Sequence, residues 1–148
     1  MSSLPASLGL LVLRVALGVT FVAHGWQKIV LQGIPATQEG FAGMWVPLAD
    51  VAAPTIAWLE IVAGIALVVG LASRVAAGLL AATSLVALFL VHAGNGFFSA
   101  EGGYEFVLVL AAAGVALVLT GPGRLAVDAV VVSRRRGRGA PGRIAQPA

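Results

Sequence analysis

The stretch LGLLVLRVALGVTFVAHGW, from Leu8 to Trp26, is long and apolar enough to cross a lipid bilayer as one helix. A bilayer core about 30 Å thick requires roughly 20 helical residues, because each residue adds about 1.5 Å. Within the stretch, Arg14 and His24 are the residues that can carry a charge. The stretch therefore predicts a membrane-spanning helix whose few polar groups need partners inside the protein.

The rest of the chain has the same character. Of its 148 residues, 59% are hydrophobic and 10% are charged, whereas an ordinary soluble domain has about 25% charged residues. Three more apolar stretches of comparable length follow, at about 48–71, 74–92 and 104–119. The sequence thus predicts an all-α, polytopic membrane protein, a four-transmembrane-helix bundle that forms one domain over residues 1–130. For residues 131–148 the composition predicts a basic, disordered cytoplasmic tail.

The charged residues divide between two sides of the predicted bundle. Arg74 and Arg124 lie on the side of the tail, whereas Glu39, Asp50 and Glu101 lie in the two longer loops. The positive-inside rule then places both termini in the cytoplasm. The tail itself holds five of the nine Lys and Arg residues, which are Arg134, Arg135, Arg136, Arg138 and Arg143. Because this basic run follows an apolar span, membrane anchoring accounts for it, and no nucleic-acid partner is expected.

Two similar sequence segments occur at the ends of the first and third predicted spans. FVAHGWQ covers residues 21–27 and FLVHAGNG covers residues 89–96. They are compatible with two parallel helical-hairpin repeats, related by an axis along the membrane normal. Coincidence among glycine-rich apolar helices is the alternative. A true repeat would bring His24 and His92 to matching depths near the outer side.

Ionisable groups within a span cost about 2.5–3.5 kcal/mol each on insertion scales, so they face the bundle interior and find partners there. Arg14 and Glu60 have similar predicted depths, which predicts an ion pair between them. The pair would fix the packing of the first two spans or, alternatively, serve a ligand or proton path. Gly18 and Gly25 lie close to the polar face of the first span, where small residues permit close approach of a neighbouring helix.

A second polar group gathers near the outer end of the predicted bundle. His24 and Lys28 are four residues apart and share a helix face. Taken singly, His92 is explained by a hydrogen bond to a loop carbonyl, and Lys28 by extension of its side chain to the membrane interface. Taken together, the group predicts a polar pocket for a small molecule. We assign the catalytic role to His24, Lys28, His92 and Glu105, and ligand contacts to Asn95 and Gly25.

A quinone headgroup suits these residues best, because its carbonyls accept hydrogen bonds while its tail lies in lipid. Haem is disfavoured, since Trp26 and Lys28 flank His24 where small residues usually surround the macrocycle. No metal is predicted, because a dinuclear site needs more carboxylates than Glu60 and Glu105 supply. The chain has no cysteine, which excludes thiol chemistry and cysteine-held clusters within it.

The sequence resembles the DoxX family of small four-helix bacterial membrane proteins over about Leu8 to Ala129. No single motif is strong, and their order and joint presence carry the resemblance. The matching positions are Arg14-(x3)-Gly18, His24-Gly25-(x2)-Lys28, Phe41, Glu60-(x3)-Gly64, Gly70, Arg74, His92-(x3)-Gly96-Phe97-Phe98, Gly102-Gly103-(x)-Glu105, Gly121-Pro122-Gly123-Arg124 and Asp128.

The resemblance implies a protein of the bacterial inner membrane and of the oxidoreductase type, since relatives in the wider group serve as subunits of quinone-linked thiosulfate oxidation. We therefore predict a quinone-linked subunit of a membrane redox complex, with a soluble or membrane redox protein as partner. Lys28 and one histidine would hydrogen-bond a quinone carbonyl, and the other histidine or Glu105 would pass protons outward. A non-catalytic scaffold that docks a soluble redox enzyme and a small transporter are the alternatives. A homo-oligomer is compatible with the sequence.

Overall fold

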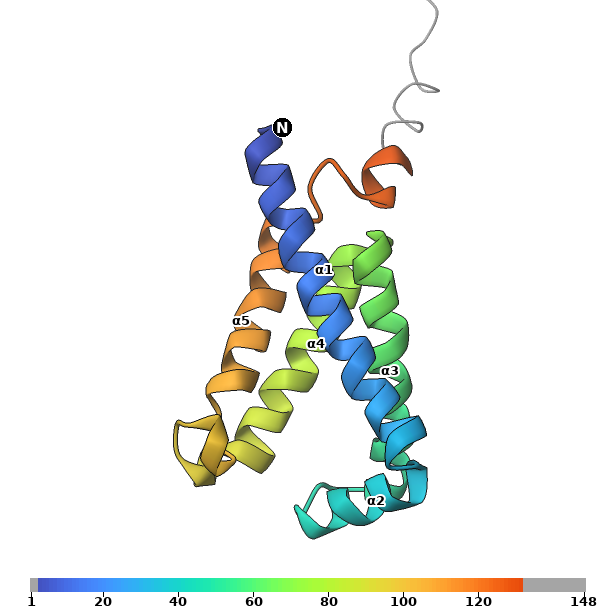
Figure 1. The fold of residues 1–148 in the computed structure, drawn as a ribbon, viewed down its shortest axis with the longest axis vertical. Coiled ribbons are helices and arrows are strands. Elements are labelled where there is room, and N and C mark those ends of the chain that lie inside the picture. The colour runs from blue at the N-terminus through green and yellow to red at the C-terminus, as the bar shows by residue number, and fades with distance from the viewer. Residues whose placement is uncertain (1–2, 132–148) are drawn as a thin grey trace, which may run out of the picture.

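A computed structural model describes residues 3–131 as an all-α fold (Figure 1). Its long helices are α1 (Leu4–Trp26), α3 (Ala49–Val69), α4 (Ser73–Ala87) and α5 (Glu105–Thr120). Within the described residues, three helices are long and apolar enough to cross a membrane, counting their extensions, and α5 is a shorter apolar helix. The predicted polytopic helical fold is confirmed. The predicted tail lies outside the described residues beyond position 131.

Two of the long helices change to a wider winding at one end, beyond the predicted end in α1 and within the predicted span in α4. The π-helical segment η1 (Gln27–Leu31) extends α1, and the π-helical segment η2 (Leu88–His92) extends α4 into the short 3₁₀ turn η3 (Ala93–Asn95). Helix α2 (Ile34–Gly43) lies across this end of the bundle, and the 3₁₀ turn η4 (Ser99–Glu101) of the other long loop lies at the same end, on the side of α5 (Figure 1). Short π-helical segments occur often at functional sites.

The long helices pack as two pairs, α1 with α3 and α4 with α5. In the first pair a Cβ on Gly18 would lie 2.6 Å from the carbonyl oxygen of Gly64, and a Cβ on Gly25 would lie 2.6 Å from that of Ala57. These glycines let the two backbones touch, as the sequence predicted for Gly18 and Gly25. Gly114 plays the same part between α5 and α4. The two pairs correspond to the predicted hairpins, and their relation by a symmetry axis stays a prediction.

The core forms where the two pairs meet, and all four long helices contribute to it. Leu17 of α1, Leu67 of α3, Leu80 of α4 and Leu117 of α5 are buried there. Large apolar side chains also cover the outside of the bundle, such as Phe89, which is 72% exposed. In water such a surface would be unfavourable, but in a bilayer it faces lipid tails that are equally apolar.

The predicted ion pair between Arg14 and Glu60 is wrong. Arg14 is 2% exposed, and its guanidinium donates to the carbonyl of Leu125, in the segment after α5. Side chains on a helix lean toward its N-terminus. Because α1 and α3 are antiparallel, Arg14 leans toward one end of the bundle and Glu60 toward the other. The Arg14 guanidinium occupies the space beside Gly70, where a Cβ would collide with it.

Asp128 completes this end of the bundle by capping α4 from a distant part of the chain. Its carboxylate accepts hydrogen bonds from the backbone N–H groups of Ala72 and Ser73, both at 2.8 Å, and its own N–H donates to Gly70. Burial opposes ionisation of Asp128, but the hydrogen bonds from Ser73 and Ala72 and the charge of Arg14 outweigh it, so the pKa of the carboxyl is lowered. The cap ties the α3–α4 turn to the segment after α5.

Candidate functional site

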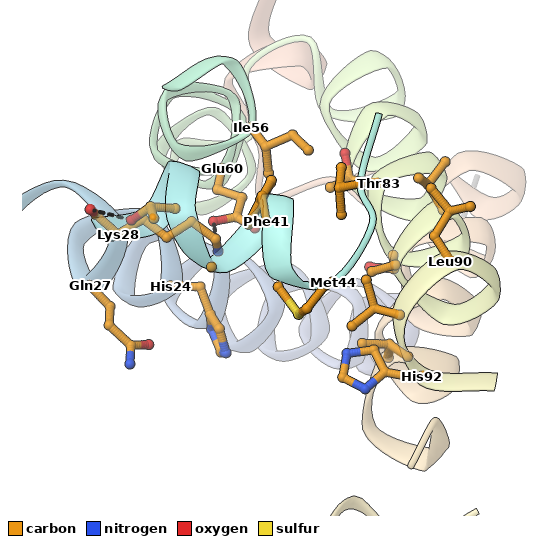
Figure 2. Close-up of a pocket in the computed structure, with 18 of the residues that line it drawn as sticks. His24, Gln27, Lys28, Phe41, Met44, Ile56, Glu60, Thr83, Leu90 and His92 are labelled. Carbon is orange, nitrogen blue, oxygen red and sulfur yellow. Dashed lines mark hydrogen bonds and ion pairs between the residues drawn. The ribbon is translucent and has the colours of Figure 1, made fainter. Parts of the chain in front are cut away.

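A cavity of about 790 Å³ lies at the α2 end of the bundle, bounded by residues of α1, η1, α2, α3, α4, η2 and α5. Figure 2 shows side chains from these elements around it. Its walls are largely apolar, with Phe21, Ile56 and Leu90 among the lining residues. Three residues of the predicted polar pocket, His24, Lys28 and His92, line this cavity, and Glu60 of the predicted ion pair lines it as well.

Lys28 and Glu60 form a salt bridge across the α1–α3 contact. Lys28 Nζ lies 2.7 Å from Glu60 Oε2, and the side chains are 18% and 7% exposed. Each side chain leans toward the N-terminus of its own helix, and in an antiparallel pair this brings the two heads together. Lys28 therefore takes the place that the sequence analysis gave to Arg14 as partner of Glu60. Figure 2 shows the pair beside the cavity.

Both histidines are held by a hydrogen bond from Nδ1 to a backbone carbonyl. His24 Nδ1 donates to Thr20 at 2.8 Å, and His92 Nδ1 donates to Gly102 at 2.7 Å. A carbonyl oxygen can only accept, so each Nδ1 carries the proton, and the other ring nitrogen, Nε2, is left to the surroundings. The ring of His24 also stacks on Phe106, with centroids 5.9 Å apart and planes at 29°. The hydrogen bond of His92 to a loop carbonyl, which the sequence analysis gave as the explanation of this residue taken singly, is present.

Helix α2 covers the cavity and is tied down by side chains that the sequence analysis did not single out. Thr37 Oγ1 donates to the carbonyls of Lys28 and Gly33, at 3.0 and 2.9 Å. Thr37 is 4% exposed, so a buried bond fastens α2 to η1 at Lys28. Phe41 and Met44 point toward the cavity (Figure 2). The tie joins α2 to η1, whose π-helical winding sequence periodicity alone does not reveal.

Two hydroxyl side chains of α4 also line the cavity. Thr83 Oγ1 donates to the carbonyl of Leu79 and Ser84 Oγ to that of Leu80, both at 3.0 Å. The sequence analysis missed both residues, because a hydroxyl in an apolar helix satisfies itself on its own backbone and carries no charge. Their adjacency in an otherwise apolar span was the available signal.

Three residues assigned to the site lie outside the cavity lining. Glu105 accepts hydrogen bonds from the N–H and the hydroxyl of Ser99, both at 2.7 Å, and so shapes the loop before α5. Asn95 Nδ2 donates to Gly102 at 3.3 Å, the same carbonyl that holds His92. Gly25 lies in the α1–α3 contact. None of these three residues lines the cavity. Their predicted catalytic and ligand-binding roles are therefore not supported by a contact with it.

No group of three or more His, Cys, Asp or Glu side chains within residues 3–131 is placed to hold a metal ion. The described cavity instead offers an ion pair, two imidazoles and several hydroxyl and amide groups around an apolar volume. This set can bind an uncharged, partly polar molecule and exchange protons with it.

Comparison with known proteins agrees with this architecture. The DoxX family profile matches residues 9–93. The chain is similar to the Bacillus subtilis protein named "Putative oxidoreductase CatD", with 33% identity over 87% of this chain and 91% of the relative. It is also similar to "Inner membrane protein YqjF" of Escherichia coli, with 31% identity over 81% of this chain and 89% of the relative. No solved structure matches the chain.

Proposed function

Because this chain belongs to the DoxX family of integral membrane proteins, we propose that it is a quinone-binding redox subunit of the bacterial inner membrane. The observation that carries the proposal is the cavity in which two histidines and the Lys28–Glu60 pair meet. The names of the two relatives, "Putative oxidoreductase CatD" and "Inner membrane protein YqjF", support the same class of function.

The cavity fits a quinone headgroup by size and by chemistry. Its volume of about 790 Å³ falls within the roughly 300–1,000 Å³ typical of small-molecule sites. Such sites combine apolar walls with a few placed polar groups. Here Phe21, Ile56 and Leu90 give apolar surface, and Lys28 and the histidines give polar contacts. An aromatic headgroup with oxygen at its edge matches both kinds of surface.

The roles of the side chains follow from their contacts. Quinones supply two-electron, two-proton chemistry when bound. Lys28 can donate a hydrogen bond to a ligand oxygen, because an ammonium has three protons and one is directed to Glu60. His24 and His92 can accept a proton from a ligand at Nε2, because Nδ1 of each ring already donates to a backbone carbonyl. Glu60 balances the charge of Lys28, which would otherwise be costly at this depth.

The electrons must come from elsewhere than thiols of this chain, because it has no cysteine. We therefore propose a soluble or membrane redox protein as donor or acceptor. The positive-inside rule supports an orientation with both termini cytoplasmic, which puts the cavity at the outer side. In this arrangement protons would be exchanged with the outer aqueous phase.

The test is to purify the protein gently into lipid nanodiscs and quantify bound quinone by mass spectrometry of an organic extract. We expect a near-stoichiometric amount in the unmodified protein and little in the His24→Ala/His92→Ala variant. Thr120→Val serves as the control, because Thr120 lies at the end of α5 away from the cavity, and its hydroxyl donates to the carbonyls of Ala116 and Gly121. Equal quinone in the double variant and the control would contradict the proposal. A quinone-free protein that co-purifies with a soluble redox enzyme would identify a scaffold instead.

A further inference from the structure

Five of the polar side chains that line the cavity give their hydrogen to backbone carbonyls. The acceptors lie at 2.8 Å from His24 Nδ1, 2.7 Å from His92 Nδ1, 2.9 Å from Thr37 Oγ1, and 3.0 Å from both Thr83 Oγ1 and Ser84 Oγ. A hydroxyl has one proton to give, and a neutral imidazole has one. The donors of all five groups are therefore committed to the protein.

What these groups can still offer a ligand is lone pairs. In a neutral imidazole with a protonated Nδ1, Nε2 is an acceptor. A hydroxyl oxygen that donates its hydrogen retains acceptor capacity. Three of the five groups, Thr83, Ser84 and His92, lie on the single continuous helix formed by α4 and η2. One wall of the cavity is thus an accepting surface.

The strong donor is on the opposite helix pair. Lys28 Nζ is paired with Glu60 and keeps further protons for a ligand. A ligand with a hydroxyl at each end can accept from Lys28 at one end and donate to an acceptor on α4–η2 at the other. A ligand carbonyl can only accept, so it satisfies Lys28 but leaves the facing lone pairs unmet. An unmet polar group in a buried site weakens binding far more than a missing apolar contact.

We infer that the cavity is selective for the reduced, hydroxyl-bearing form of its ligand, a hydroquinone, over the oxidised quinone. The inference rests on the proposed function and adds the redox state of the preferred ligand. The selectivity comes from the carbonyls of Thr20, Gly102 and the α4 backbone, which fix the direction of each hydrogen bond. The oxidised form is then the one released more readily.

The experiment compares decylubiquinol with decylubiquinone on the full-length protein in nanodiscs of quinone-free lipid. Isothermal titration calorimetry under oxygen-free conditions gives Kd for each form, with empty nanodiscs as the blank. We expect a Kd for the quinol lower by about tenfold or more, the range by which buried hydrogen-bonding sites discriminate against ligands that leave them unpaired.

Two variants locate the source of the preference. His92→Gln replaces an accepting Nε2 with an amide that can also donate, so the ratio of the two Kd values should fall toward one. Thr83→Val removes one accepting oxygen and should weaken quinol binding more than quinone binding. Thr120→Val is the matched control, because Thr120 Oγ1 also donates to the carbonyl four residues earlier but does not line the cavity.

The outcomes separate the two proposals. Tighter binding of the quinol, with a ratio that falls in His92→Gln and Thr83→Val but not in Thr120→Val, supports the inference. Equal or tighter binding of the quinone would overturn it and leave the proposed function standing. A quinol preference that is unchanged in both variants would also overturn it, because the named acceptors would not be its source. Binding of neither form would overturn the proposed function itself.

Discussion

Replacing Gly18 with alanine should force α1 and α3 apart. The added Cβ would lie 2.6 Å from the carbonyl oxygen of Gly64 and 3.2 Å from the backbone nitrogen of Val68, whereas ordinary contacts begin at 3.4 Å. Both obstacles are backbone atoms of a helix, which cannot rotate away as a side chain can. The helices must therefore separate by close to 1 Å, or tilt, at the crossing point.

The cost follows from overpacking. Inserting one methyl group into a tight contact costs about 1–3 kcal/mol, and exchange of glycine for alanine returns up to about 1 kcal/mol of helix propensity. We expect a net loss of about 1–2 kcal/mol in the free energy of unfolding. The same separation would lengthen the 2.7 Å contact between Lys28 and Glu60, so ligand binding should weaken as well.

Reversible unfolding in mixed detergent micelles, titrated with dodecyl sulfate and followed by tryptophan fluorescence, measures this loss. Gly9→Ala is the matched control, because Gly9 lies in the same helix and a Cβ there meets nothing within 4 Å. We expect Gly9→Ala to be neutral or stabilising. If Gly18→Ala unfolds at the same detergent fraction as Gly9→Ala, the close α1–α3 contact is not present as described, and the reasoning fails.

Three further predictions concern charged groups. Lys28→Met or Glu60→Gln alone should destabilise the protein by about 3–5 kcal/mol, because each leaves a buried partner without its counter-charge. The Lys28→Glu/Glu60→Lys exchange should recover part of this loss. The same detergent titration measures the stability of all three variants. Asp128→Asn should cost about 1–2 kcal/mol, because the carboxylate caps the Ala72 and Ser73 N–H groups, and hydrogen exchange at the start of α4 should report it. The pKa of Asp128 is lowered in the folded state. Its contribution to the free energy of unfolding should therefore be complete above the ordinary pKa of 3.8 and should be lost as the pH falls through the lowered pKa. The difference in stability between the unmodified protein and Asp128→Asn should thus disappear only in acid.

Each of these has a result that would count against it. A charge exchange no better than the single variants would mean that Lys28 and Glu60 act separately. A stability gap for Asp128→Asn that closes between pH 7 and 5 would mean that the pKa of Asp128 is raised and not lowered.

The sequence determined the membrane fold by itself. Apolar stretches of bilayer length and few charges predict a bundle of spanning helices, because backbone polar groups in lipid must be satisfied within the segment. It also selected His24, Lys28, Glu60 and His92, since an ionisable residue in a span needs a reason to be there. These inferences rest on local composition and residue spacing, which can be read directly from the sequence.

The tertiary structure decided which of these groups meet. The predicted depths in the membrane suggested that Arg14 pairs with Glu60. In the structure Glu60 pairs with Lys28, because side chains of two antiparallel helices lean in opposite directions and the Gly18–Gly64 contact sets the register of the helices. It also decided that Glu105 shapes a loop. The direction of the cavity's hydrogen bonds depends on carbonyls such as that of Gly102, which any residue type would carry. The backbone makes these contacts only in the folded structure, so the residue type at a position does not predict them.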